Sequence, residues 1–242
     1  MYALVDYDNL RPDQKRLALT ELARRIADAV LAAAPTPPGT LDVRLYGGWY
    51  AVDAVRGTHR PTAAAQELMR SVGSSDFPFF YTPSGHPGRI RVLMSLARSM
   101  LVDPSRDLVR TYRPKPLYSL IGKPRSVKTV CQHDDKAQCC LRGLKKLFTK
   151  QVCPDCAAVS TDFLPPGGEQ KLVDTMIAAD LLQAAASGEG VALVSSDDDF
   201  VPPIWQGVVT GGTVYHIQTY PGRLLEAHYR PAAGLAYHPL SL

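Results

Sequence analysis

The chain has 242 residues, 45% of them hydrophobic, and a formal net charge of +4. This length and composition suffice for one substantial core, or for one core that carries a sizeable insertion. No uninterrupted apolar run approaches the roughly 20 residues needed to span a bilayer, and the N-terminus lacks the basic and apolar regions of a signal peptide. We therefore expect a cytoplasmic protein without a membrane partner.

The N-terminal half alternates between strand and helix patterns. Residues 2–9 predict a short apolar strand that stops on carboxylates, and residues 9–34 show largely helical spacing of apolar side chains. Residues 41–46 alternate between apolar and polar, which predicts a second strand. A second helix is expected over residues 62–72, and a further strand within 89–101.

The C-terminal half continues the same alternation. Helices are expected over residues 169–186 and 200–210, with strands over 191–195 and 213–217 and a Pro-rich, irregular tail. Alternating strands and helices at both ends of the chain predict an α/β fold with a doubly wound, mostly parallel, Rossmann-like sheet.

Positive charge is concentrated in the middle of the chain. The segment from Arg106 to Lys150 holds twelve Lys or Arg and three Asp or Glu, a local charge of +9, whereas the remaining 15 basic and 20 acidic residues give −5. We therefore divide the chain into an α/β domain, residues 1–105 and 165–242, and a basic insertion, residues 106–164.

A basic segment on an acidic body favours a polyanionic partner, here RNA, with DNA as an alternative. A solvated loop with an ordinary excess of charge is the simpler interpretation. The side chains expected to contact phosphates are Arg113, Lys115, Lys123, Arg125, Lys145 and Lys146.

All five cysteines lie between Cys131 and Cys156. An odd number of clustered cysteines argues against a disulfide framework and for a reduced protein with a local cysteine site. The pair Cys153 and Cys156 has the spacing of a zinc knuckle. Buried free thiols or a redox pair are the alternatives to zinc. The expected zinc ligands are Cys131, Cys139, Cys153 and Cys156, with Cys140 or His133 as substitutes.

Carboxylates follow two of the expected strands. Asp6 ends the first strand, and Asp197 and Asp199 follow the strand over residues 191–195. In a parallel α/β sheet the ligand crevice lies beyond the carboxyl ends of the strands. Asp174, in the first turn of a helix, can enter this crevice from the side. Clustered carboxylates repel one another unless a divalent cation neutralises them, and Mg²⁺ or Mn²⁺ suits oxygen ligands.

These carboxylates define a candidate catalytic centre. Metal ions held by carboxylates can activate water and stabilise the leaving oxygen of a phosphodiester. Asn9 would orient the scissile phosphate or a ligand water. For any single aspartate a helix cap is the simpler interpretation. Asp8, Asp180 and Asp198 are not included in the set. The expected catalytic and Mg²⁺/Mn²⁺ set is Asp6, Asp174, Asp197 and Asp199.

Three motifs resemble one family of nucleases. The segments Val5-Asp6-Tyr7-Asp8-Asn9, Lys171-Leu172-Val173-Asp174 and Ser195-Ser196-Asp197-Asp198-Asp199-Phe200 are similar to patterns of the NYN branch of the PIN-like nucleases. The resemblance covers about residues 2–81 and 169–217. Leu172 and Ser196 stand where that family usually has glycine.

The resemblance implies a PIN-like sheet and a metal-dependent ribonuclease, most simply an endoribonuclease, acting through the aspartates named above. An RNA-binding or regulatory member with little turnover is one alternative. A phosphatase of the haloacid dehalogenase class is another. It would use Asp6 as nucleophile and Asp8 as acid/base, but Leu10 stands where that class has Thr or Val.

Overall fold

The computed structural model describes residues 1–52, 59–73, 76–83, 88–108, 113–114, 168–169, 171–220 and 234–242. The chain divides into two compact units, Met1–Thr111 with Gln170–Leu242, and Tyr112–Glu169. In the second unit, the short strand β7 (Arg113–Pro114) pairs antiparallel with β8 (Gly168–Glu169).

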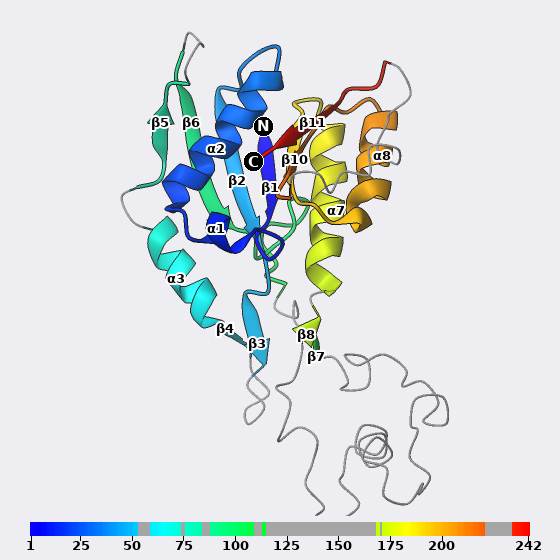
Figure 1. The fold of residues 1–242 in the computed structure, drawn as a ribbon. Helices are drawn as coiled ribbons and strands as arrows, with labels where there is room; N and C mark the ends of the chain where they lie inside the picture. Colours follow the sequence, from blue (N-terminus) through cyan, green and yellow to red (C-terminus); the bar gives the residue numbers. More distant parts are fainter. Residues whose placement is uncertain are drawn as a thin grey trace, which may run out of the picture. The chain divides into compact units, whose positions relative to one another are not determined.

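The first unit is built on a seven-stranded sheet with the order β11-β10-β9-β1-β2-β6-β5 (Figure 1). Neighbouring strands are parallel except β5, which runs antiparallel to β6. The expected α/β fold with a mostly parallel sheet is therefore confirmed. The strands are β1 (Tyr2–Asp6), β2 (Thr40–Tyr46), β5 (Phe79–Tyr81), β6 (Ile90–Leu96), β9 (Val191–Val194), β10 (Val214–Gln218) and β11 (Tyr237–Ser241).

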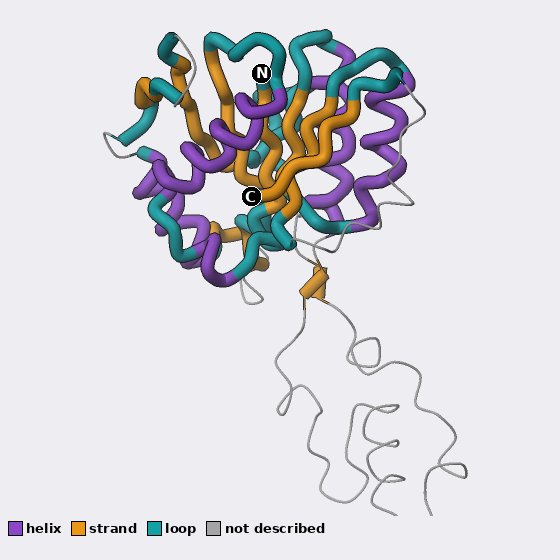
Figure 2. The backbone as a smooth tube through the Cα atoms, turned by 45° about the horizontal axis from the view of Figure 1, so that its top comes forward, coloured by secondary structure: helices purple, strands orange, loops and turns teal. Residues whose placement is uncertain are grey.

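Helices cover both faces of this sheet (Figure 2). The side chains of α2 and α3 pack in one buried cluster, and those of α7 and α8 pack in a second. A small hairpin of β3 (Tyr50–Val52) and β4 (His59–Pro61) stands apart from the main sheet. The helices are α1 (Pro12–Lys15), α2 (Leu19–Ala33), α3 (Ala63–Val72), α7 (Lys171–Ala186) and α8 (Val201–Val209), with a 3₁₀ turn η2 at Asp198–Phe200.

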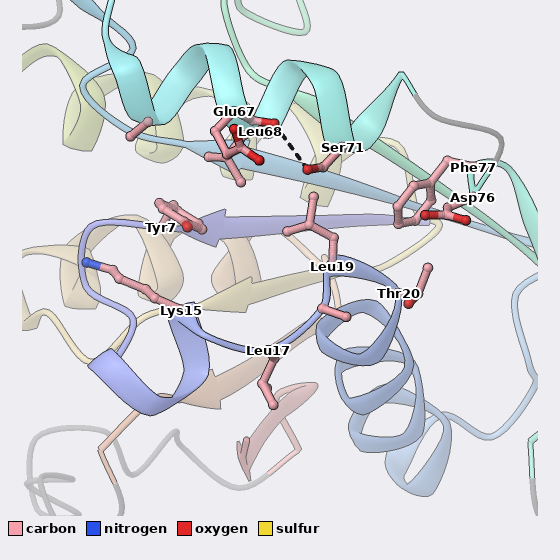
Figure 3. Close-up of a pocket in the computed structure, with 12 residues that line it drawn as sticks. Tyr7, Lys15, Leu17, Leu19, Thr20, Glu67, Leu68, Ser71, Asp76 and Phe77 are labelled. Atoms are coloured by element: carbon pink, nitrogen blue, oxygen red, sulfur yellow. Dashed lines mark hydrogen bonds between the residues drawn. The ribbon is translucent and has the colours of Figure 1, made fainter.

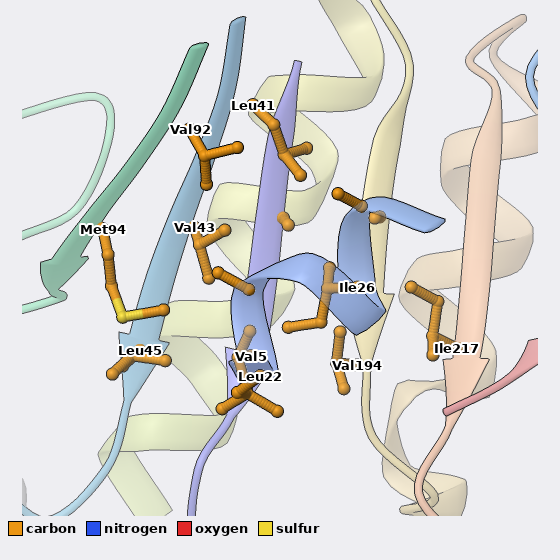
Figure 4. Close-up of a cluster of buried hydrophobic side chains, with 14 of the residues drawn as sticks. Val5, Leu22, Ile26, Leu41, Val43, Leu45, Val92, Met94, Val194 and Ile217 are labelled. Atoms are coloured by element: carbon orange, nitrogen blue, oxygen red, sulfur yellow. The ribbon is translucent and has the colours of Figure 1, made fainter. Parts of the chain in front are cut away.

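The two faces of the sheet draw on alternate residues of each strand. In β1, Ala3 and Val5 belong to the cluster under α2, whereas Leu4 faces α7. Figure 4 shows Val5 beside Leu22 and Ile26 of α2. Every residue of β9 is buried, as expected for a central parallel strand covered on both faces.

The single helix expected over residues 9–34 is wrong, because the structure has two helices there. The backbone of Ala18 is extended (ψ 141°) where α2 begins. The buried side chain of Gln14 explains the separation, since its amide donates to the carbonyl of Thr219 at 3.2 Å. This bond ties α1 to the end of β10, while α2 lies along the sheet.

The irregular tail expected at the C-terminus is also wrong. Residues Tyr237–Ser241 form β11, which pairs parallel with β10. Pro239 is tolerated because β11 is an edge strand, where a missing N–H need not break a ladder. Leu240 packs on the core under α2. Strand β10 is already buried in the sheet. A short segment that is only half apolar can therefore pair with it as the edge strand.

Candidate active site

The candidate site lies at the carboxyl ends of β1 and β9. From β1 the chain passes to β2 on one side, whereas β9 lies on the other side of β1. This is a topological switch point, where ligands bind in doubly wound sheets. Asp6 is the last residue of β1, and Ser195 directly follows β9. The register pairs Val5 with Val194, so Asp6 and Ser195 stand side by side.

Asp6 is a buried carboxylate with two hydrogen-bond donors. Only 4% of its surface is exposed. The Ser195 hydroxyl donates to one oxygen, Oδ2, at 3.0 Å, and the backbone N–H of Asn9 donates to the other, Oδ1, at 3.3 Å. The Ser195 oxygen in turn accepts the backbone N–H of Asp197 at 3.1 Å. Ser195 therefore joins Asp6 to the loop that carries Asp197.

Burial raises the pKa of Asp6 from 3.8 to about 7. The donors Ser195 and Asn9 act in the opposite direction, but the negative charges of Asp174 and Asp8 raise the pKa further. Burial costs the carboxylate its hydration, and each neighbouring carboxylate repels its charge. None of the described groups that shift the pKa of Asp6 is a cation.

Asp174 lies in the first turn of α7, as the sequence predicts, and is partly buried. Its effect on the pKa of Asp6 means that the two carboxylates are electrostatic neighbours. They come from elements far apart in the sequence, β1 and α7. Within the expected quartet, Asp174 is thus the member whose charge acts on Asp6.

The other two members of the quartet lie on η2. Asp197 is the N-cap of this turn, and its carboxylate accepts the backbone N–H of Asp199 at 3.1 Å. Asp199 itself is exposed. Over the part of the chain that the structure describes, no three Asp, Glu, His or Cys side chains are grouped to hold a metal ion. The quartet is therefore not assembled as one ligand set.

Asn9 contacts Asp6 through its backbone. Its N–H donates to the carbonyl of Asp6 at 3.2 Å as well as to the carboxylate. This contact shapes the turn after β1 and does not depend on the side-chain amide.

Asp180 belongs to the core and not to the crevice. It is fully buried, and it accepts the Tyr46 hydroxyl at 2.6 Å and the Leu101 N–H at 2.7 Å. The Arg44 guanidinium lies 3.8 Å from the same carboxylate. Burial raises the pKa of Asp180, although these three partners act to lower it. Helix α7 therefore carries one carboxylate near Asp6 and another that fastens the helix to the sheet.

Asp8 braces the turn after β2. Its carboxylate is exposed and accepts the backbone N–H of Gly48 at 3.0 Å. A Cβ on Gly47 would lie 2.9 Å from the same carboxylate and 2.8 Å from the Trp49 ring. Glycine at position 47 therefore allows the turn to approach Asp8 closely.

Ser196 has a definite structural role at the position where the resemblance expects glycine. Its hydroxyl oxygen accepts the backbone N–H groups of Thr219 at 2.9 Å and of Tyr220 at 3.0 Å. The Thr219 hydroxyl lies 3.1 Å away and donates to the same oxygen. The serine thus ties the loop after β9 to the segment after β10, which a glycine at this position would not do.

Gln218 is a polar residue of the same edge that sequence reasoning missed. It ends β10, and the register places it beside Ser195, in one row with Asp6. It is 3% exposed, and its amide nitrogen has no hydrogen-bond partner among the described residues. Its position could have indicated this, because Gln218 ends β10, the next parallel strand after β9.

His216 is a core residue. Its Nε2 lies 3.0 Å from the carbonyl of Ser195, and its Nδ1 lies 2.9 Å from the Tyr237 hydroxyl. Burial lowers its pKa to about 4. The imidazole is therefore neutral at pH 7, donating from Nε2 and accepting at Nδ1.

The expected zinc and phosphate contacts concern a different part of the chain. The structure describes the backbone of Arg113, in β7, but not its side chain. The remaining residues lie outside the described part: Lys115, Lys123, Arg125, Lys145 and Lys146, and Cys131, His133, Cys139, Cys140, Cys153 and Cys156.

Comparison with known proteins gives no match, whether against protein-family models, curated proteins or solved structures. Among the described helices, none combines the length and the apolar character needed to cross a membrane.

Proposed function

We propose that the chain is a metal-dependent ribonuclease of the NYN/PIN-like type that hydrolyses RNA phosphodiester bonds at the carboxyl edge of its sheet. One observation carries the proposal. Asp6 is a buried carboxylate at the topological switch point, and a second carboxylate, Asp174, acts on it electrostatically. The motif resemblance of the sequence supports the same assignment.

Two of the expected carboxylates, Asp6 and Asp174, fit a divalent cation as a pair. Burial and the repulsion from Asp174 both disfavour the ionised form of Asp6, and a cation would offset both effects. Carboxylate oxygens are the ligands that Mg²⁺ and Mn²⁺ prefer. Asp6 and Asp174 would hold the ion, and Asp197 would join them by exchanging its bond to the Asp199 N–H. Bound there, the ion would supply charge neutralisation and an acidified water.

The protein's own groups keep this carboxylate in place. The Ser195 hydroxyl and the Asn9 N–H fix both oxygens of Asp6, so its orientation does not depend on the ion. Ser196 holds the loop after β9 against the end of β10. Such second contacts restrict the ligand geometry, which catalysis requires.

RNA is the proposed substrate because the basic segment between Arg106 and Lys150 carries a charge of +9. Lysine and arginine contacts to phosphates supply affinity that does not depend on base sequence. A zinc ion bound by the cysteines would order this segment, since a small core-poor unit gains stability from a structural metal. A cytoplasmic location agrees with reduced cysteines.

The test incubates purified protein with single-stranded RNA and DNA, with Mg²⁺, Mn²⁺ or EDTA. We expect metal-dependent cleavage of RNA that Asp6→Asn and Asp174→Asn abolish. Asp198→Asn is the matched control, because Asp198 is exposed on η2. No hydrolysis of either nucleic acid with either metal would overturn the enzyme proposal. RNA binding without cleavage would instead support the regulatory alternative.

A further inference from the structure

A cavity of about 460 Å³ lies on the other face of the sheet from Asp6. Its walls come from the segment between α1 and α2, from the start of α2, and from α3 (Figure 3). Its volume falls within the range of roughly 300–1,000 Å³ typical of small-molecule sites. All of its lining residues belong to the first compact unit.

The cavity adjoins the candidate active site through two consecutive residues. Val5 packs on the face of the sheet under α2, so the alternation of the strand turns Asp6 to the opposite face. Tyr7 packs against the same cluster as Val5 and lines the cavity. Asp6 and Tyr7 therefore stand on opposite sides of one sheet edge.

The Tyr7 ring is held from two sides. The Trp49 ring lies 5.7 Å from it between centroids, tilted by 49°, and Trp49 is itself fixed by its indole N–H, which donates to the Leu45 carbonyl at 3.2 Å. The Lys15 ammonium lies 5.7 Å from the Tyr7 centroid and donates to the Asp8 carbonyl at 3.0 Å. A fixed aromatic ring in a cavity wall suits the stacking of a planar ligand.

The polar groups of the wall suit a nucleobase with an exocyclic amine. Among the described residues that line the cavity, Lys15 is the cation, and Glu67 and Asp76 carry carboxylates. The Arg70 guanidinium lies 2.7 Å from one oxygen, Oε2, of Glu67. Figure 3 shows Glu67 on the α3 side and Asp76 beside Phe77 at the end of the cavity away from Tyr7. Carboxylates accept hydrogen bonds from the amino groups of adenine, guanine and cytosine, which uracil lacks.

We propose that this cavity binds one amino-bearing nucleobase of single-stranded RNA, next to the phosphate presented to Asp6. The inference rests on the proposed ribonuclease function and specifies its substrate. A nucleotide carries its base and its phosphate on opposite sides of the ribose. It can therefore straddle the edge between Tyr7 and Asp6.

The test measures binding of AMP, GMP, CMP and UMP in EDTA, by calorimetry and by intrinsic tryptophan fluorescence, so it requires no hydrolysis. Ala63 and Ala64 are both exposed in the first turn of α3, but only Ala64 lines the cavity. Ala64→Phe should weaken AMP binding about tenfold, whereas Ala63→Phe should leave it unchanged. Tyr7→Leu, which removes the stacking ring, should weaken it to a similar extent.

Two results would overturn the inference: no nucleotide bound at millimolar concentration, or AMP bound equally by wild type, Ala64→Phe and Tyr7→Leu. UMP binding as tightly as AMP would overturn the amine recognition. Nucleotide binding that Ala64→Phe weakens, in a protein that cleaves no RNA, would refute the nuclease but keep the site. RNA cleavage with an unchanged KM in Ala64→Phe would refute the site alone.

Discussion

The hydroxyl of Tyr46 donates a 2.6 Å hydrogen bond to the carboxylate of Asp180, which lies 134 residues further along the chain. Both residues are buried, and the bond joins the end of β2 to the middle of α7. Helix α7 also carries Asp174 in its first turn. The contact therefore fixes the helix that presents Asp174 to Asp6.

Tyr46→Phe should lower the free energy of unfolding by about 2 kcal/mol, because it removes a donor from a buried carboxylate. Urea denaturation measures the change. Tyr50→Phe is the control, since the Tyr50 hydroxyl is 3.4 Å from a partly exposed Asp107 carboxylate and should contribute little. Equal stabilities of the two variants would contradict the role of the Tyr46–Asp180 bond.

His216 should make stability fall as the pH decreases from about 6.5 to about 4. Its pKa in the folded protein is lowered to about 4, so the unfolded chain binds the proton first and acid favours unfolding. The full difference between the unfolded and folded pKa values corresponds to about 3 kcal/mol of stability. Asp6 acts in the opposite direction over the same pH range, because its folded pKa is raised to about 7.

The contribution of His216 is therefore measured as the difference between wild type and His216→Gln, by urea denaturation at pH 4.5 and pH 7. The destabilisation caused by the substitution should be smaller at the lower pH. His238→Gln is the control, because His238 lies on the edge strand β11 and is partly exposed. Equal pH slopes in wild type and His216→Gln would show that burial does not hold this histidine neutral.

The strand positions could be predicted because the central strands of a parallel sheet are continuous apolar runs bounded by turn residues. β1 and β9 follow this rule, and Asp6 and Ser195 follow directly from their ends. The tail could not be predicted in the same way. An edge strand such as β11 needs only one partner and one apolar face, so Pro239 in its middle gives a misleading signal.

The candidate site was predictable only in part, for a similar reason. The position of an aspartate relative to the strand ends indicates which carboxylates lie at the same edge of the sheet. It does not indicate which hydrogen-bond partners each carboxylate has. Asp180 and Asp174 have the same chemistry in the same helix, and only the buried partners of Asp180, Tyr46 among them, assign it to the core. The cavity beside Tyr7 is lined by segments distant in sequence, so no local sequence pattern predicts it.

Two buried glutamines should respond oppositely to the same substitution. Gln14 uses both ends of its amide, donating to Thr219 and accepting the Arg11 N–H at 2.9 Å. The amide nitrogen of Gln218 has no hydrogen-bond partner in the part of the chain that the structure describes. Gln14→Leu should therefore destabilise by about 1–3 kcal/mol, whereas Gln218→Leu should be neutral or stabilise by about 1 kcal/mol. Chemical denaturation of both variants checks the contrast, and a large loss in Gln218→Leu would show that its amide is satisfied.

Asp6→Asn should stabilise the metal-free protein at pH 8 while abolishing cleavage. The pKa of Asp6 is raised to about 7, so its stabilising protonated form is lost as the pH rises from about 4 to about 7, and the penalty is complete at pH 8. Asparagine removes that charge and can still accept the Ser195 hydroxyl. We expect a gain of about 1–3 kcal/mol, below the full value of about 4 kcal/mol because one carboxylate contact is lost.

Adding Mn²⁺ should make the wild type more stable than the Asp6→Asn protein, the reverse of the metal-free order. The ion binds the folded wild type and raises its Tm, whereas the Asp6→Asn protein, lacking the central ligand, should gain little. Asp13→Asn is the matched control, because Asp13 is an exposed carboxylate paired with Arg11. It should leave both the metal-free stability and the Mn²⁺ response unchanged. An equal rise in Tm for Asp6→Asn and wild type would mean that the ion binds elsewhere, and that Asp6 is a buried structural acid without a metal role.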